Sequence, residues 1–368
     1  MAQIRSAMSL FSGMGGDSLG IQEAGFNVVA FNEFDKSAVK SHLNNFPHST
    51  LIQDPTQKKP KDKTNIQLIP DEYFLEYKDT IDLIFAGHPC QGFSNGGKKL
   101  PNDPRNTLFR EFARVCKLVK PKYIIGENVD GLLNRKTSTD ENYIDVIVRE
   151  FDAIGYNVTY QVCHIVKYGV PQLRKRLVYV GVRKDLKQTY TFPEPLNNGK
   201  TNLPNLENII RFDMKGAIKI EPDDFDFTSI PDDCILKDLN NTDVEVPEDV
   251  HPYLRLKAKT RNKEYSGKIH PNLLSFSKRD SPIHGEVIDI RKPSKTIICS
   301  YDHQPRLFVP LQNKNGYYIR CILPDELKQI QGFPADFKLY GSIKDKIKQI
   351  GNAVPPPLIS QIVKKLGK

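Results

Sequence analysis

The sequence predicts an α/β fold in its first half and a smaller, loop-rich domain after it, and three observations lead to this prediction. Short apolar runs of strand length alternate with longer amphipathic runs from Ala7 to about Arg183. Several of the apolar runs end in a glycine, an acidic residue or a cysteine, at the position where open α/β sheets bind their ligands. Beyond Arg183 the alternation disappears, and proline, aspartate and asparagine become frequent.

Composition narrows the class of protein. The chain has 368 residues, and 53 lysines and arginines against 44 aspartates and glutamates give a formal net charge of +9, which favours a polyanionic partner. No run approaches the ~18 apolar residues of a membrane span, and the N-terminus lacks a signal-peptide pattern. The six cysteines form no CxxC pair, so the sequence predicts neither a metal site nor a disulfide framework. We expect a reduced, cytoplasmic protein.

The first βαβ unit has the pattern of a nucleotide-binding site. Residues 7–11 form an apolar strand that runs into the glycine turn 12–17, and residues 19–24 have a helical pattern. A second strand, 28–31, leads to Glu33, at the spacing of an acid that accepts hydrogen bonds from ribose hydroxyls. The unit therefore predicts a ribose-bearing cofactor, against the alternative of an ordinary glycine turn.

The glycine spacing narrows that cofactor. The pattern GxGG is not the GxGxxG of dinucleotide sites, and no GxxxxGK[ST] phosphate loop occurs. An adenosine cofactor without a phosphate chain fits better than NAD or ATP, and S-adenosylmethionine is the candidate. Residues 35–50 have a helical pattern, and a third strand, 50–54, ends in Asp54. This carboxylate either accepts a hydrogen bond from an adenine amino group or caps a turn.

A cysteine follows the next strand. Residues 81–85 form a buried strand that Gly87 and Pro89 end, which places Cys90 at the carboxyl edge of the sheet. The alternative is that Cys90 is an ordinary buried thiol. The loop 92–105 that follows is rich in glycine and lysine, and it is either a mobile lid that contacts phosphates or a solvated basic loop.

The remaining strands bring further charged groups. After a helix at 107–119, the apolar strand 123–129 carries Glu127 near its end, where a carboxylate is costly to bury without a partner. We expect Cys90 and Glu127 to lie at the tips of neighbouring strands. A helix at 143–154 and a strand at 158–166 follow. Arg174 and Arg176 alternate on the next strand, so they are expected on one side, facing a phosphate or carbonyl oxygen or else solvent. The chain ends in a turn at 331–334 and an amphipathic helix at 358–366.

Short motifs in a fixed order identify a family. In chain order they are Phe11-Ser12-Gly13-Met14-Gly15-Gly16, Asn32-Glu33-Phe34-Asp35, Asp54, Pro89-Cys90-Gln91-Gly92-Phe93-Ser94, Arg105-Asn106-Thr107-Leu108-Phe109, Glu127-Asn128-Val129, Gln172-Leu173-Arg174-Lys175-Arg176, residues 291–296, Gln331-Gly332-Phe333-Pro334 and Gly351-Asn352-Ala353-Val354-Pro355. With these motifs the chain resembles the cytosine-C5 DNA methyltransferases of bacterial restriction–modification type over nearly its full length. The resemblance implies an S-adenosylmethionine-dependent, Rossmann-like mixed sheet in a catalytic domain, 1–184 completed by 321–368, and a target-recognition domain, 185–320.

The resemblance implies a covalent mechanism. The Cys90 thiolate would add to C6 of a cytosine, and the enamine formed would take a methyl group at C5 from S-adenosylmethionine. Glu127 would hydrogen-bond the N3 and N4 edge of the ring, and Arg176 would bind O2 with support from Arg174. A base that the sequence does not identify would then remove the C5 proton.

The resemblance also implies binding residues. Phe11 would lie against the adenine, Glu33 on the ribose hydroxyls and Asp54 on the adenine amine; Phe34 stands where many relatives have tryptophan. The other cofactor contacts implied are Gly13, Gly15, Gly16, Pro89, Leu108, Asn352 and Val354. The target base would be flipped out of double-stranded DNA, and the DNA contacts implied are Gln91, Ser94, Lys98, Lys99 and Arg105.

Four alternative functions fit the sequence less well than this one. A tRNA cytosine-5 methyltransferase would carry a Cys-Phe-Thr tripeptide, and none occurs; a non-catalytic DNA-binding relative would lose the Pro-Cys or the Glu-Asn pair, and both are present. A nicotinamide dehydrogenase is disfavoured by the glycine spacing, and a methyltransferase for an exocyclic amine would need an (Asp/Asn/Ser)-Pro-Pro-aromatic motif, which is absent. We expect a monomer, with a cognate restriction endonuclease as a possible partner.

Overall fold

The computed structural model describes residues 5–89, 108–137, 139–196, 203–220, 227–240, 264–265, 268–269, 273–274, 285–301 and 306–367. The chain divides into two compact units: the first comprises Met1–Asn202, Asp336–Tyr340 and Ala353–Lys368, and the second comprises Leu203–Ala335 and Gly341–Asn352. This division differs from the expected domain bounds at two places. Residues 185–202 belong to the first unit, and residues 321–335 and 341–352 belong to the second.

The first unit is built on a sheet of seven strands among the described residues, in the order β3-β2-β1-β4-β5-β8-β6. Neighbouring strands from β3 to β5 run parallel, whereas β8 is antiparallel to both β5 and β6. The sheet is therefore mixed, as expected. Its strands are β1 (Arg5–Leu10), β2 (Phe26–Asn32), β3 (Thr50–Leu51), β4 (Leu83–Ala86), β5 (Tyr123–Asn128), β6 (Tyr156–His164) and β8 (Lys175–Arg183).

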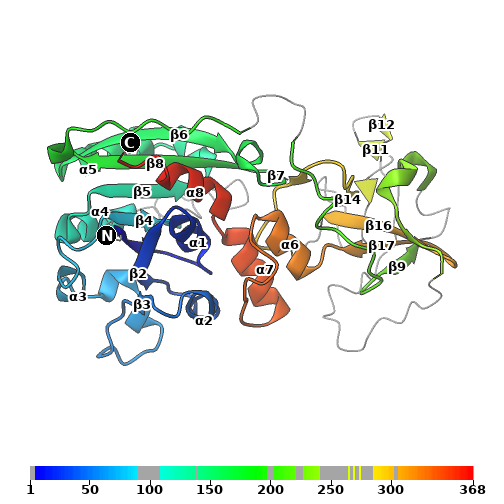
Figure 1. The fold of residues 1–368 in the computed structure, drawn as a ribbon, viewed down its shortest axis with the longest axis horizontal. Helices are drawn as coiled ribbons and strands as arrows, with labels where there is room; N and C mark the ends of the chain where they lie inside the picture. The colour runs from blue at the N-terminus through cyan, green and yellow to red at the C-terminus, as the bar shows by residue number, and fades with distance from the viewer. Residues whose placement is uncertain are drawn as a thin grey trace. The chain divides into compact units, whose positions relative to one another are not determined.

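Helices cover both faces of this sheet (Figure 1). Buried side chains of α4 (Phe109–Val119) and α5 (Tyr143–Ala153) pack in one core, and those of α1 (Gly16–Glu23) and α8 (Pro356–Val363) pack in the other. The strands between the two cores carry apolar residues on both faces, which explains their continuous apolar runs. The unit also contains α2 (Lys36–Asn45), α3 (Glu72–Leu75), β7 (Gln172–Leu173) and 3-10 turns at Asp62–Thr64, Ile66–Leu68, Asp130–Asn134, Ile165–Tyr168 and Lys184–Leu186.

Two sequence expectations about this unit are wrong. The third strand is shorter than the predicted 50–54, because β3 ends at Leu51 and Asp54 lies in the turn beyond it. Arg174 is not on the strand that carries Arg176, because it lies between β7 and β8. The alternation argument therefore does not place the two arginines on one side.

The second unit contains a six-stranded sheet among its described residues, although the sequence shows no clear rhythm there. Its path runs β13-β14-β16-β17-β9, with β10 paired to β16. The elements of this unit are β9 (Ile218–Ile220), β10 (Leu236–Asp238), β11 (Glu264–Tyr265), β12 (Lys268–Ile269), β13 (Leu273–Leu274), β14 (Gly285–Val287), β15 (Ser294–Lys295), β16 (Leu307–Asn313), β17 (Gly316–Cys321), α6 (Pro324–Ile330), α7 (Ile343–Asn352) and 3-10 turns at Phe227–Ser229 and Asp232–Cys234.

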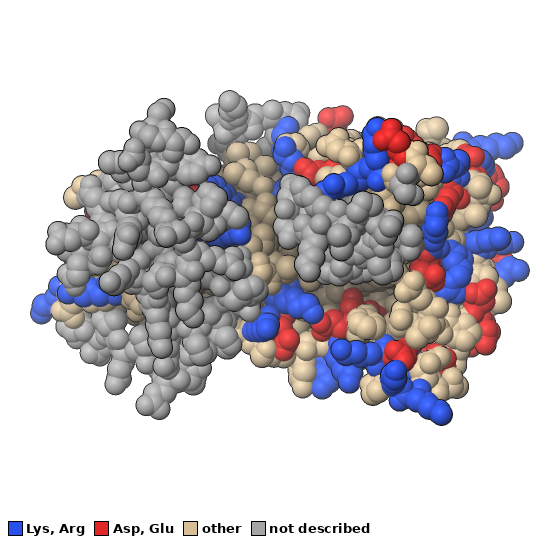
Figure 2. Space-filling model, turned by 180° about the vertical axis from the view of Figure 1, so that it is seen from behind, with Lys and Arg blue, Asp and Glu red and all other residues tan. Residues whose placement is uncertain are grey.

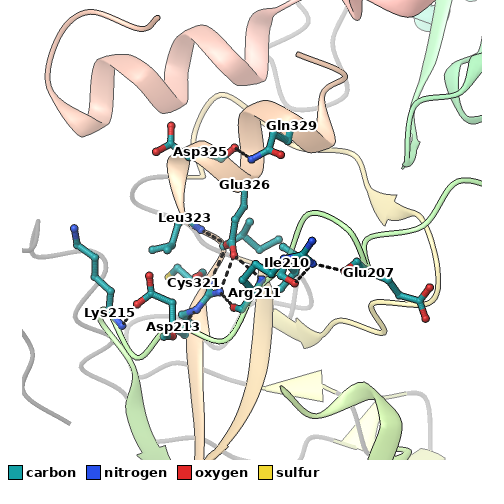
Figure 3. Close-up of polar contacts among 12 residues, drawn as sticks. Glu207, Ile210, Arg211, Asp213, Lys215, Cys321, Leu323, Asp325, Glu326 and Gln329 are labelled. Carbon is teal, nitrogen blue, oxygen red and sulfur yellow. Dashed lines mark hydrogen bonds and ion pairs between the residues drawn. The ribbon is translucent and has the colours of Figure 1, made fainter. Parts of the chain in front are cut away.

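A buried ion pair joins the parts of the second unit (Figure 3). The Arg320 guanidinium on β17 is fully buried and binds both carboxylate oxygens of Glu326 on α6 at 2.8 Å. Its other N–H groups donate to the carbonyl oxygens of Arg211, Asp213 and Cys321 at 2.8–2.9 Å. Glu326 also accepts the N–H of Leu323 at the start of α6. The Arg320–Glu326 pair therefore holds β17, α6 and the segment 211–213 together.

Replacing Arg320 with methionine is expected to destabilise the chain by about 3–5 kcal/mol, because Glu326 would be left buried without its counter-charge. Guanidinium unfolding followed by circular dichroism measures the change. The double variant Arg320→Met/Glu326→Leu should recover most of the loss. Lys237→Met, which removes a solvent-exposed pair with Asp232, should cost no more than about 1 kcal/mol. Equal effects of Arg320→Met and Lys237→Met would contradict the role of the buried pair.

Candidate active site

The carboxyl ends of four neighbouring strands of the first unit form one row. In the parallel register, Leu10 pairs with Asn32 on one side and with Ala86 on the other, and Ala86 pairs with Gly126. The residues that follow these four positions are Phe11, Glu33, Gly87 and Glu127, so the sheet brings the predicted cofactor and catalytic segments to the same edge. This is the edge at which open α/β sheets bind ligands.

The glycine turn after β1 is shaped by its backbone. Phe11 itself adopts a left-handed conformation with φ of 55°, which is costly for an aromatic residue and which the sequence did not reveal. Gly13 and Gly15 also have positive φ, at 54° and 98°. A Cβ at Gly13 would meet nothing within 4 Å, whereas one at Gly15 would lie 2.5 Å from the Phe46 ring. Gly13 therefore leaves open space for a ligand, and Gly15 is required for packing.

Glu33 connects the end of β2 to this turn. Its carboxylate accepts the Gly13 N–H at 2.8 Å and the Asp35 N–H at 2.6 Å. Burial raises the pKa of Glu33 above its ordinary value, against the lowering effect of these hydrogen bonds. The neighbouring Phe34 ring is 51% exposed. An anchored carboxylate beside an uncovered aromatic ring suits a sugar and a flat base.

Asp54 acts as a turn cap in this structure. Its Oδ1 accepts the Thr56 N–H and hydroxyl at 2.9 and 2.6 Å, and its Oδ2 accepts the Gln57 amide at 2.9 Å. These hydrogen bonds lower the pKa of Asp54, although the residue is only 2% exposed. The structure thus contains the turn contacts that the sequence left as an alternative, and a contact with adenine stays a prediction.

Glu127 and Arg176 form an ion pair between β5 and β8. Arg176 Nε lies 2.6 Å from Glu127 Oε1, and both side chains are mostly buried. The carboxylate that sequence reasoning expected to need a partner therefore has one. Arg174 is buried as well, and its backbone N–H and carbonyl are held by Gln172 and Ile165. The two arginines thus have different environments.

Other predicted cofactor residues lie in different places. Val354 Cγ2 and the Phe11 carbonyl oxygen would lie 3.5 and 3.8 Å from a Cβ at Gly87, so these segments meet at the exit of β4. Gly16 begins α1, Leu108 precedes α4, and Pro89 is half-buried. Asn352 is the last residue of α7 in the second unit. The predicted residues Cys90, Gln91, Ser94, Lys98, Lys99 and Arg105 lie outside the described residues.

The sequence did not point to two buried groups near this edge. Asp17, in the first turn of α1, accepts a hydrogen bond from the Ser9 hydroxyl, and burial raises its pKa to about 7. His88 has both ring nitrogens in hydrogen-bonding contact, with Asn128 and with Tyr179. One sequence feature could have indicated His88, because this histidine stands directly before Pro-Cys at the end of an apolar strand.

Charge is mixed on one face of the first unit. On the face that Figure 2 shows, lysine and arginine side chains are interspersed with aspartates and glutamates. The basic loop 92–105 that was expected to contact phosphates lies outside the described part. Within the described residues, no group of His, Cys, Asp and Glu side chains could hold a metal ion, and no helix is long and apolar enough to span a membrane.

Comparison with known proteins decides the family. The family model described as C-5 cytosine-specific DNA methylase matches residues 6–368. The chain belongs to the C-5 cytosine-specific DNA methylases. This match confirms the family that the motifs predicted. It also confirms the predicted activity class, a DNA cytosine-5 methyltransferase.

Several known proteins match the chain along nearly its whole length. The Type II methyltransferase M.FnuDI of Fusobacterium nucleatum is 31% identical over 98% of this chain and 93% of its own, and M.NgoPII of Neisseria gonorrhoeae is 30% identical over 98% and 95%. The crystal structure of a protein described as a DNA modification methyltransferase encoded in an E. coli prophage has a TM-score of 0.61 and 25% identity, with 98% of each chain covered. A Spodoptera frugiperda DNMT2 structure, at 18% identity and a TM-score of 0.61 over 99% and 100%, shares the fold.

Proposed function

We propose that this enzyme transfers a methyl group from S-adenosylmethionine to C5 of a flipped-out cytosine within a specific sequence of double-stranded DNA. Family membership supports the base and the atom, and the row of strand ends supports the place of the reaction. Because the relatives named above are Type II methyltransferases, we propose that the enzyme is the modification component of a restriction–modification system with a cognate endonuclease. We further propose that it works as a monomer in the cytoplasm, on the nucleoid.

The edge of the sheet fits the proposed cofactor. The open space at Gly13, the anchored Glu33 and the exposed Phe34 ring suit an adenosine group without a phosphate chain. Glu33 would bind the ribose hydroxyls, Phe11 would lie against the adenine and Asp54 would hold its amine. S-adenosylmethionine bound there supplies the methyl group. The remaining contacts would come from Gly15, Gly16, Pro89, Leu108, Asn352 and Val354.

The proposed chemistry begins at Cys90. Its thiolate forms a bond to C6 of cytosine, and the electron pair of the C5–C6 double bond becomes available at C5. Glu127 hydrogen-bonds the N3 and N4 edge, which favours the protonated ring that accepts attack. Arg176 binds O2, with Arg174 in support. After C5 has gained its methyl group, a base removes the C5 proton, the C5–C6 double bond forms again and Cys90 leaves as a thiolate.

The Glu127–Arg176 ion pair carries this assignment among the described residues. In this pair a carboxylate and a guanidinium lie 2.6 Å apart near the carboxyl end of β5. In the sheet, β5 is the neighbour of β4, the strand that leads to Cys90. The carboxylate suits the N3 and N4 edge of a cytosine, and the guanidinium suits the O2 carbonyl oxygen of the same ring. The loop residues Gln91, Ser94, Lys98, Lys99 and Arg105 are proposed to contact DNA, and the second domain is proposed to recognise the target sequence.

Bisulfite sequencing of DNA from a methylation-deficient bacterium that expresses the chain tests the function. We expect protected cytosines confined to one short sequence, and duplexes with 5-fluorocytosine at that position should form a covalent adduct, because fluorine cannot leave as a cation. A host that expresses Cys90→Ser is the control and should show no protection. Methylation without any adduct on the fluorinated duplex would contradict the covalent mechanism, and no protected cytosine at all would contradict the function.

A further inference from the structure

The histidine next to the proposed nucleophile is buried in a hydrogen-bonded network. His88 lies on the segment between the end of β4 and Cys90, and it is only 5% exposed. Its Nδ1 lies 3.1 Å from Asn128 Nδ2, and its Nε2 lies 3.0 Å from the Tyr179 hydroxyl. Asn128 Nδ2 also donates to the His88 carbonyl oxygen at 3.2 Å. Both the ring and the backbone of His88 are therefore held by the end of β5.

These contacts define the protonation state of the ring. The Val129 N–H donates to Asn128 Oδ1 at 2.8 Å, which directs the Asn128 amide nitrogen to His88. An amide nitrogen only donates, so His88 Nδ1 accepts and the ring proton of the neutral imidazole lies on Nε2, where it donates to Tyr179. Burial lowers the pKa of His88 to about 4, which keeps the ring neutral at neutral pH.

Gly126 makes the contact with Tyr179 possible. Gly126 on β5 is the cross-strand partner of Tyr179 on β8, and a Cβ at Gly126 would lie 1.9 Å from Tyr179 Cζ. The tyrosine ring therefore lies over the bare glycine, and its hydroxyl reaches the segment after β4. Side chains alternate along a strand, so Gly126 and Asn128 face this network while Glu127 between them faces the opposite side, toward Arg176.

We propose that His88 is a positioning residue, which joins Asn128 and Tyr179 and so sets the chain that leads into Cys90 against the strand that carries Glu127. The inference rests on the proposed roles of Cys90 and Glu127 and adds a residue that those roles do not include. The network contacts β5 at Gly126 and Asn128, which flank Glu127 and face the opposite side of the sheet from it. Loss of the His88 contact with Asn128 or with Tyr179 therefore changes how the Cys90 thiolate approaches the cytosine ring that Glu127 binds. Small displacements of this kind cost catalysis strongly.

A double-mutant cycle tests the proposal. His88→Phe removes both ring nitrogens, Tyr179→Phe removes the hydroxyl, and the readout is the single-turnover transfer of tritiated methyl groups from S-adenosylmethionine to unmethylated genomic DNA. Each variant should be slower by about tenfold or more, and the double variant should be no slower than His88→Phe, because the two side chains act through one contact. The affinity for S-adenosylhomocysteine should stay within about twofold, since the network does not touch the glycine turn.

Tyr190→Phe is the matched control, because it removes a buried tyrosine hydroxyl that donates to the Ile362 carbonyl oxygen at 2.9 Å in the same unit. It should lower the melting temperature as Tyr179→Phe does and leave the transfer rate unchanged. Nitrogen-15 NMR of the histidine rings should show a single Nε2–H tautomer for His88 in the wild type. In Tyr179→Phe, the His88 ring should no longer be fixed in that tautomer. Wild-type transfer by His88→Phe, or a slow Tyr190→Phe, would overturn the positioning role. Failure of the wild type to label DNA would instead contradict the proposed function.

Discussion

Replacing Cys90 with serine is expected to abolish methyl transfer, by several orders of magnitude, while S-adenosylhomocysteine still binds. A serine hydroxyl stays protonated at neutral pH, whereas a thiol supplies the thiolate that the addition to C6 needs. Single-turnover labelling measures the rate, and calorimetric titration with S-adenosylhomocysteine measures the affinity.

The matched control for this prediction is Cys299→Ser. Cys299 is an exposed free cysteine of the second unit, and its substitution should leave the rate unchanged. Turnover by Cys90→Ser at the rate of Cys299→Ser would refute the assignment of the nucleophile.

Replacing Glu127 with glutamine is expected to lower the single-turnover rate by about 10²–10⁴-fold, the range for loss of a general acid. Glutamine keeps the size of the side chain, but it cannot hold a proton for the N3 position and it removes the charge that pairs with Arg176. The rate is measured on DNA at saturating concentrations of both substrates.

Glu150→Gln provides the comparison, because Glu150 pairs with Arg110 at the surface of the same unit. Such surface pairs contribute little to stability, so this variant should behave as wild type. If the two glutamine variants have similar rates, Glu127 has no part in the chemistry.

Much of the first unit could be predicted because its elements are local. Each strand that passes through the row at Leu10, Asn32, Ala86 and Gly126 was visible as an apolar run, and a glycine or acidic residue marked the end of that run. Parallel strands with helices on both faces must bury both of their sides, which makes such runs easy to detect. The same pattern predicted that the strand before Cys90 and the strand that carries Glu127 are neighbours in the sheet.

The rest depends on contacts between distant segments. Gly126 has no pattern of its own, and only the Tyr179 ring across the strand explains it. Arg174 was assigned to a strand because alternation was the only local signal. In the second unit, β9 pairs with β17, so residues near 218 depend on residues near 318 for their conformation. Short strands of this kind gain little from local propensity, and the sequence shows no rhythm there.

The position of α8 has a consequence for synthesis in the cell. Helix α8 packs against α1, and a Cβ at Gly20 of α1 would lie 2.5 Å from the Pro356 carbonyl oxygen. The part of this sheet face that α8 covers beside α1 therefore stays exposed while the ribosome translates the whole of the second unit. The apolar strands must wait for residues 353–368 to emerge, and a nascent chain stalled before them would expose that face to chaperones and proteases.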